Sequence, residues 1–203
     1  IRFSQDEGIT WTEENTFLNG LPVLGFPIRA HSFSDVKSDV SEGILTKTPN
    51  GNLLILIREE MLAHKHNGTH VLRSSDGGAT WEDEGKINND NALLMGGQVI
   101  TVDSDLYATF WVDENADYVP PFKTVLYRSP DQGKSWVHVS DVTSTGTAES
   151  ALAYLGQKEL LAVLADDTAA EKTYLRRSSD LGKSWKDLQD LTHLLGVLAR
   201  PKF

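Results

Sequence analysis

The sequence has 203 residues, of which 39% are hydrophobic and 24% charged, a balance typical of a folded globular domain. Acidic residues outnumber basic residues by 29 to 19, and the formal net charge of −10 argues against nucleic-acid binding through a general basic surface. There is no cysteine, which excludes disulfides, thiolate metal sites and cysteine nucleophiles. No run of apolar residues is long enough to predict a membrane span.

A short motif at residues 4–11 occurs four times in the chain. The further copies run over residues 74–81, 129–136 and 178–185, and the consensus is Ser-x-Asp-x-Gly-x-Thr/Ser-Trp. The aspartate can accept hydrogen bonds from backbone amides ahead of it. The glycine permits a positive φ, and the tryptophan places a large ring beside the turn. The motif therefore predicts a tight turn that closes a strand pair.

Strand-like runs fill the segments between the copies. Residues 41–58, 97–111 and 149–164 each suggest a strand, a turn and a strand, and residues 69–73, 123–128 and 172–177 suggest a third strand. With a fourth strand after the motif, each unit has the period of roughly 40–50 residues that is typical of propeller blades. Only residues 188–195 approach helical spacing. The sequence thus predicts an all-β propeller of four-stranded antiparallel blades.

The repeated motif resembles the Asp box, or BNR repeat, of sialidases (neuraminidases) and sialidase-like β-propellers, and the resemblance covers residues 4–185. It implies one incomplete propeller domain over residues 1–203, of a kind with about six blades when complete. About four blades are expected here: full units at about 41–90, 91–140 and 148–190, with partial blades at both ends. The missing initiator methionine and the end of the chain within an expected strand favour a portion of a longer protein. The resemblance also implies that the Asp boxes are structural and face away from the active site.

Glu42 and Arg58 are the first candidates on the expected active face. Glu42 begins a first strand and Arg58 ends its hairpin partner, so the two side chains are expected near the same face. In sialidases a glutamate at such a position supports a tyrosine nucleophile, and the arginine belongs to a cluster of three that holds the substrate carboxylate. The alternative is a salt bridge at the rim, which would contribute little to stability.

Glu149 and Arg200 are candidates by the same resemblance. The segment Ala148-Glu149-Ser150 resembles a sialidase strand start more closely than Glu42 does, but Ala165 stands where the matching arginine would fall. Arg200 precedes a proline at the expected start of a further strand. By resemblance Arg200 is expected to bind an anion, whereas Glu149 could equally be an exposed carboxylate at a strand end.

The loop after Arg58 holds two further candidates, His64 and His66. The corresponding sialidase loop carries an aspartate that acts as general acid/base, and residues 59–68 contain no aspartate. A histidine, with an unperturbed pKa of about 6.5, could transfer a proton instead. The two histidines alone would make an incomplete metal site, and a solvated polar loop is the alternative interpretation.

A third group of candidates ends the second strand of the middle unit. Asp113, Glu114 and Asp117 precede the aromatic and proline-rich segment 118–122, which could offer a stacking platform for a sugar ring. A surface loop packed on its own aromatic side chains is the more favoured interpretation of this segment.

Together these features favour a carbohydrate-active enzyme, most simply a glycoside hydrolase of the exo-sialidase type acting on an acidic or sialylated glycan. Glu42, Glu149, His64 and His66 are the catalytic candidates, and Arg58 and Arg200 the substrate-binding ones. The alternatives are a propeller that binds glycans or proteins without catalysis, and a lyase acting on uronic-acid polysaccharides. No cofactor or metal is expected, the expected partner is a glycan, and the resemblance suggests a secreted or periplasmic protein.

Overall fold

The computed structural model describes residues 4, 6–10, 17–18, 21–22, 38–61, 65–90, 92–114, 119–144, 146–168 and 171–196. Within strands 17–18, 21–22, 38–42, 59–61 and 65–67, only the backbone is described. The described helical elements are the 3-10 turn η1 (Ile87–Asn89) and the short helix α2 (Thr192–Leu195). The chain is therefore all-β, as the sequence predicts.

Three four-stranded antiparallel sheets account for most of the described residues. The first sheet holds β3 (Ser38–Lys47), β4 (Leu53–Met61), β5 (Lys65–Ser74) and β6 (Glu82–Lys86). The second holds β7 (Leu93–Val102), β8 (Asp105–Val112), β9 (Lys123–Ser129) and β10 (Val137–Asp141). The third holds β11 (Thr147–Gly156), β12 (Glu159–Asp166), β13 (Thr173–Ser178) and β14 (Gln189–Asp190). A separate pair joins β1 (Phe17–Leu18) to β2 (Leu21–Pro22).

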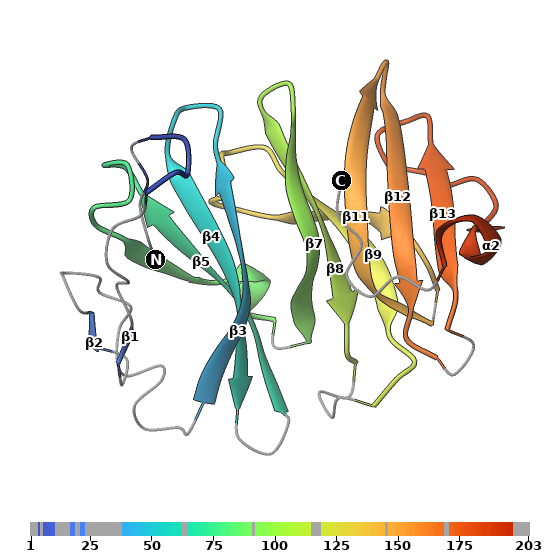
Figure 1. Ribbon diagram of the computed structural model, residues 1–203, viewed down its shortest axis with the longest axis horizontal. Coiled ribbons are helices and arrows are strands. Elements are labelled where there is room, and N and C mark those ends of the chain that lie inside the picture. Colours follow the sequence, from blue (N-terminus) through green and yellow to red (C-terminus); the bar gives the residue numbers. More distant parts are fainter. Residues whose placement is uncertain are drawn as a thin grey trace.

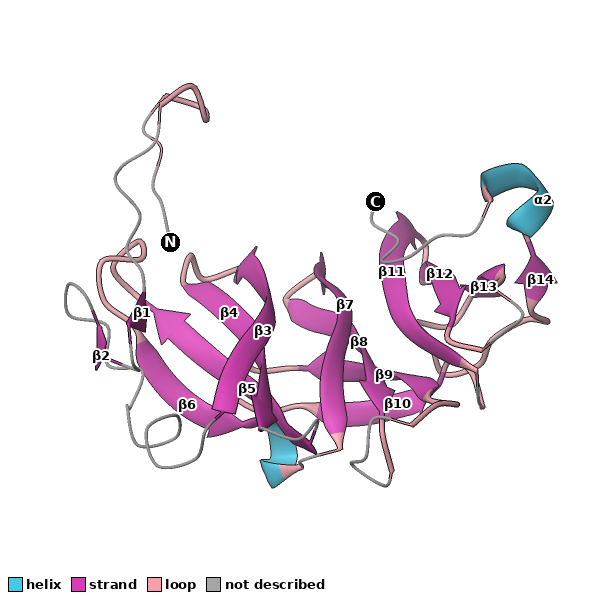
Figure 2. Cartoon of the chain, turned by 60° about the horizontal axis from the view of Figure 1, so that its bottom comes forward, coloured by secondary structure: helices cyan, strands magenta, loops and turns pink. Residues whose placement is uncertain are grey.

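The sheets stand side by side in chain order (Figure 1). In each sheet the strands follow one another in sequence order, and the first strands β3, β7 and β11 line one side of the array (Figure 2). Antiparallel neighbours need only short connections, which explains how units of about 50 residues each form one complete sheet.

Apolar side chains between neighbouring sheets form two buried clusters. Between the first and second sheets, Leu54 and Leu56 pack in one cluster with Phe110, and the Trp136 ring lies edge-on to Phe110 with centroids 5.8 Å apart. Between the second and third sheets, Leu126 packs in a cluster with a set of third-sheet leucines: Leu152, Leu160 and Leu164. Burying these side chains against the next sheet stabilises the array of sheets.

The Asp-box motif forms the turn between the third and fourth strands of each sheet, as predicted. In the second sheet, the Asp131 carboxylate accepts hydrogen bonds from the Ser135 amide (2.8 Å) and from Ser129 Oγ (2.9 Å). The Gly133 amide donates to Ser129 Oγ at 2.7 Å, and Gly133 has a φ of 89°. Asp76 and Asp180 make equivalent contacts. Hydrogen bonds from the hydroxyl groups of Thr80 and Ser184, then from the amides of the same residues and from the box serines, lower the pKa of each aspartate from 3.8 to about 2.

The box tryptophans differ in their burial. Trp81 and Trp136 are buried, whereas Trp185 is half-buried and donates from Nε1 to Ser140 Oγ of the preceding sheet at 2.9 Å. Trp11 lies outside the described residues. The predicted burial of a ring beside each turn is therefore confirmed for the first two sheets and holds in part for the third.

Equivalent threonines join each sheet to the segment that follows it. Thr69 Oγ1 donates to the Leu93 carbonyl (3.0 Å) and accepts from the Met95 amide (2.8 Å). Thr124 Oγ1 lies 2.8 Å from Thr147 Oγ1, and Thr173 Oγ1 donates to the Gly196 carbonyl at 2.8 Å. Each of these threonines stands five residues before the serine of its Asp box. We call these contacts the threonine clasps.

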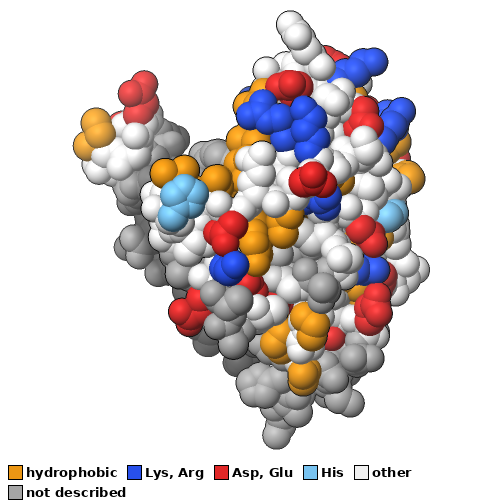
Figure 3. All heavy atoms as spheres, turned by 90° about the vertical axis from the view of Figure 1, so that its right-hand side faces the viewer, with side chains coloured by type: hydrophobic (Ala, Val, Ile, Leu, Met, Phe, Trp, Pro, Cys, Tyr) orange, Lys and Arg blue, Asp and Glu red, His pale blue; other side chains and the backbone are white. Residues whose placement is uncertain are grey.

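The side of the third sheet carries acidic and basic side chains interspersed with apolar ones (Figure 3). The exposed large apolar side chains of its last segment are Leu188, Leu194 and Leu195. Among the described helices, neither is long and apolar enough to cross a membrane.

Candidate functional site

The Asp boxes and the candidate site residues lie at opposite ends of the sheets. The boxes follow β5, β9 and β13, at the same end as the β3–β4, β7–β8 and β11–β12 hairpin turns. The opposite end gathers the starts of the first strands and the ends of the second strands, because neighbouring strands run antiparallel. We call this the site end; Glu42, Arg58 and Glu149 all belong to it.

Glu42 and Glu149 occupy equivalent backbone positions in the first and third sheets. Glu42 lies at a register shift between Ser41 and Gly43, and Glu149 at one between Thr147 and Ser150. Gly43 pairs with Ile57 and Ser150 with Leu164, which are themselves equivalent. A bulge re-aims the side chain that it contains and is common beside active sites. The structure therefore places both predicted glutamates at the same kind of irregularity.

Arg58 ends the regular part of β4 and is only 5% exposed. Its guanidinium carbon lies 5.4 Å from the centroid of the Trp111 ring, a cation–π geometry that holds the cation against a flat apolar face. The strand registers make Arg58, Trp111 and Ala165 equivalent in the three sheets, since each pairs with one of the clasp threonines. Among the three described four-stranded sheets, only the first carries an arginine at this position.

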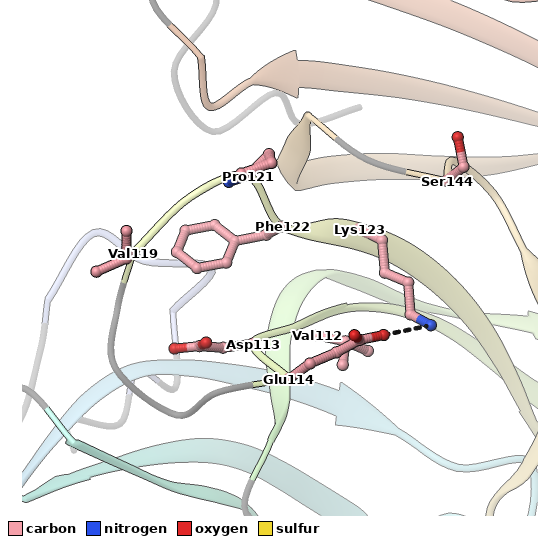
Figure 4. Close-up of a pocket in the computed structure, with 8 residues that line it drawn as sticks. All are labelled: Val112, Asp113, Glu114, Val119, Pro121, Phe122, Lys123 and Ser144. Carbon is pink, nitrogen blue, oxygen red and sulfur yellow. Dashed lines mark ion pairs between the residues drawn. The ribbon is translucent and has the colours of Figure 1, made fainter.

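Trp111 connects Arg58 to a pocket at the site end of the second sheet. The Trp111 ring packs on Phe122 with centroids 4.5 Å apart. Phe122 in turn lines a cavity of about 230 Å³ with the end of β8 and the start of β9 (Figure 4). Asp113, two residues after Trp111 and 2% exposed, borders this cavity. The sequence favours a surface loop over a stacking platform for a sugar ring in this segment; the structure places Asp113 and Phe122 in the walls of a cavity.

Asp167 is the equivalent of Asp113 in the third sheet. Asp167 Oδ2 accepts a hydrogen bond from the Phe122 amide at 2.7 Å, which ties the two sheets together at the site end. Its Oδ1 is buried without a hydrogen-bond partner among the described residues. Burial raises the pKa of Asp167, and the neighbouring charge of Asp166 raises it further, against the opposing effect of the Phe122 amide. A raised pKa brings a carboxyl group closer to the range in which it can act as a proton donor.

Close packing of β11 against the second sheet fixes the backbone around Glu149. Ser150 Oγ donates to Thr109 Oγ1 at 2.7 Å. A Cβ atom on Gly97 would overlap Thr109 Oγ1 and would lie 2.8 Å from the Ser150 carbonyl oxygen. Glycine is therefore required at position 97 for β11 to approach this closely. Glu149 is partly buried beside this contact, on a strand that has little freedom to shift.

The histidine and Arg200 predictions fall largely outside the described residues. His64 and Arg200 lie outside them. The sequence analysis placed His66 on a loop, which is wrong: it lies on β5 with its backbone paired to Glu60. The β4–β5 hairpin continues past Arg58 because a register shift between Arg58 and Glu60 is absorbed within the ladder.

Sequence reasoning missed Trp111, Lys123 and Asp167 as parts of the site end. The signal that could have found Trp111 was the repeat itself: aligning the second strands of the units on their first leucines, Leu53, Leu106 and Leu160, places Trp111 and Ala165 at the position of Arg58. Among the described residues, no group of three or more histidine, aspartate or glutamate side chains is arranged to hold a metal ion.

The chain matches the BNR repeat-like domain over residues 1–195 and therefore belongs to that family. Among curated proteins, no match was found. The sialidase-like propeller predicted from the Asp boxes is confirmed by this match and by the solved structures that share the fold.

Three solved structures illustrate the similarity. A protein of unknown function from Dyadobacter fermentans is 17% identical with a TM-score of 0.68, covering 90% of this chain and 55% of its own. A Hadza microbial sialidase is 18% identical with a TM-score of 0.66, covering 92% of this chain and 39% of its own. The GH93 α-L-arabinofuranosidase of Fusarium graminearum, solved with arabinobiose, is 20% identical with a TM-score of 0.61, covering 80% and 51%. At these identities the likeness shows the fold, and the chain spans about half or less of each neighbour.

Proposed function

We propose that the protein is a glycoside hydrolase that binds a glycan at the site end of its sheets. The observation that carries the proposal is the convergence there of a buried arginine on an aromatic ring with partly or fully buried carboxyl groups, Asp113 and Asp167. Glycoside hydrolysis needs two carboxyl groups, one protonated and one ionised. The solved neighbours that share the fold include a sialidase and an arabinofuranosidase, which supports carbohydrate as the substrate class.

Glu149 and Glu42 are proposed as the carboxylates that act on the substrate. Their equivalent bulges at the starts of β11 and β3 support this role. Asp167, with its raised pKa, is proposed as a proton donor, and His64 or His66 as groups that assist proton transfer.

Arg58 and Arg200 are proposed to bind the substrate, with Arg58 held in place by the Trp111 ring.

The exo-sialidase type, acting on an acidic or sialylated glycan, is the finer form of the proposal. Arg58 supports it, because a buried guanidinium is well suited to a sugar carboxylate. The positions equivalent to Arg58 in the second and third sheets are Trp111 and Ala165, so further arginines would have to come from other parts of the site.

A substrate screen tests the proposal. The full-length protein would be incubated with aryl α-sialosides, aryl arabinosides, neutral oligosaccharides and acidic polysaccharides, and released sugar and unsaturated products would be measured separately. Release of free sugar that is abolished in Glu149→Gln supports the hydrolase. Unsaturated uronic products would instead indicate the lyase, and binding without any product would indicate a propeller that only binds glycans.

A further inference from the structure

The cavity at the site end of the second sheet is small and has walls of two kinds. It measures about 230 Å³ and is lined by one set of residues from β8, β9 and the segments that follow them: Val112, Asp113, Glu114, Val119, Pro121, Phe122, Lys123 and Ser144. Pockets for drug-sized ligands measure about 300–1,000 Å³. A cavity below that range is suited to a single sugar ring rather than to an oligosaccharide.

The apolar wall is built on Phe122. Phe122 is 7% exposed, its ring packs on Trp111, and its amide donates a hydrogen bond to Asp167. Figure 4 shows the Phe122 ring on the same side as Val119, above the Asp113 carboxylate. A rigid aromatic face beside a carboxylate can pack against the C–H face of a sugar while a hydroxyl at the ring edge donates to the acid.

The polar wall is acidic. Asp113 and Glu114 border the cavity, and the lining ammonium of Lys123 is already held between two carboxylates, Glu114 at 3.1 Å and Asp141 at 3.8 Å. A carboxylate offers about four lone-pair positions, so each acid can accept from a sugar hydroxyl in addition to the contacts it already makes. A sugar carboxylate would instead be repelled by these acidic side chains and by the net charge of the chain, which is −10.

From this geometry we infer that the cavity is a subsite for one neutral, hydroxyl-rich sugar ring of the glycan, with Phe122 as its platform and Asp113 and Glu114 as acceptors. The inference rests on the proposed function, because it assigns a place to one part of that substrate. Arg58 contacts the Trp111 ring but does not line the cavity, so a carboxylated sugar, where the glycan has one, belongs beside Arg58 and not in the cavity.

Calorimetric titration of the full-length protein tests the subsite. The probes are arabinobiose and lactose, which are neutral, and digalacturonic acid, which is anionic. Asp113→Asn keeps the shape of the side chain but removes its charge, and we expect it to weaken binding of a neutral probe by roughly 10-fold. Glu114 is 72% exposed, so Glu114→Gln is expected to fold normally and to weaken binding several-fold. Glu82→Gln makes the same change at an exposed residue of β6 and should leave binding unchanged.

The subsite is overturned if neither neutral probe binds at millimolar concentration, if digalacturonic acid binds more tightly than both, or if Asp113→Asn and Glu114→Gln bind like the unaltered protein. Failure of the proposed function would look different. If a neutral sugar binds and Asp113→Asn weakens that binding, but the protein releases no sugar from any substrate, the subsite is supported and the hydrolase proposal is wrong. If the protein hydrolyses a glycan and neither Asp113→Asn nor Glu114→Gln changes the rate or the binding, the hydrolase proposal is supported and the subsite is wrong.

Discussion

The hydroxyl groups of Thr124 and Thr147 lie 2.8 Å apart and join the third strand of one sheet to the first strand of the next. Both side chains are buried, and the Thr143 hydroxyl bonds to Thr147 and accepts from the Thr124 amide. Since Thr69 and Thr173 make related contacts, the position of each sheet is set partly by polar bonds inside an otherwise apolar contact. Buried polar groups of this kind stabilise only while every partner is present.

Thr124→Val tests this clasp. The substitution keeps the shape of the side chain but removes the hydroxyl that bonds to the hydroxyl and carbonyl of Thr147. We therefore expect the free energy of unfolding to fall by about 1–3 kcal/mol. Urea unfolding measures the change. Thr101→Val, at an exposed position of β7, is the control and should have little effect. An unchanged free energy of unfolding in Thr124→Val would show that apolar packing alone positions the sheets.

Asp131→Ala should lower stability without changing catalysis. It removes the acceptor for the Ser135 amide and for two hydroxyl groups within the box turn. Because Ser135 is exposed, water replaces part of what is lost, and we expect a cost of about 1 kcal/mol. Reduced turnover at unchanged stability would place the boxes in the chemistry and contradict the assignment of the two ends.

Stability should also depend on pH through Asp180. Its hydrogen bonds to Ser184 and Ser178 lower the pKa in the folded state from 3.8 to about 2. The folded state therefore favours the ionised form, and the resulting stabilisation is present above about pH 4 and is lost as the pH falls toward 2. Asp180→Asn should remove this contribution, so that its melting temperature falls less steeply than that of the unaltered protein over this interval. Parallel curves would refute the assignment.

Glu149→Gln should reduce turnover much more than substrate affinity. The amide retains the size of the carboxylate, and β11 is held by the Ser150–Thr109 bond, so the fold should be unaffected. Steady-state kinetics on whichever substrate the screen identifies gives kcat and KM separately. An effect confined to KM would make Glu149 a binding group, and no effect would return it to the status of a carboxylate at a strand end.

Arg58→Lys should weaken substrate binding and leave kcat less changed. Lysine retains the charge but loses the planar group that lies on Trp111 and that binds a carboxylate through two bonds. We expect KM to rise by about 10-fold. The comparison substrate is a neutral glycan; an equal rise in KM for neutral and acidic substrates would mean that Arg58 shapes the site without contacting a carboxylate.

The repeat allowed much of the fold to be predicted, because each Asp box closes on itself. Asp76 accepts hydrogen bonds from both Ser74 and Thr80 within a span of seven residues, so the spacing alone predicts the turn. The contacts at the site end are different. Asp167 and Phe122 are 45 residues apart, and the pKa of Asp167 depends on how their two sheets meet. No local pattern reports such a contact.

The same limit applies to the cavity. The sequence favours a surface loop over a sugar platform for the segment that contains Phe122, since nothing in the segment shows that the Trp111 ring packs on Phe122. The bulges at Glu42 and Glu149 were equally hidden, because a bulge leaves the hydrophobic pattern of a strand nearly unchanged.

The separation of the two ends has a practical consequence for handling the protein. Lys134 and Lys183 are exposed within their box turns, at the end of the sheets away from Arg58 and Glu149. A dye, an affinity tag or a linker attached at either lysine would leave the site end open to solution. When the protein is immobilised in this orientation, a long polysaccharide can reach the site end. Random attachment would turn the site end of some molecules toward the support and block it sterically.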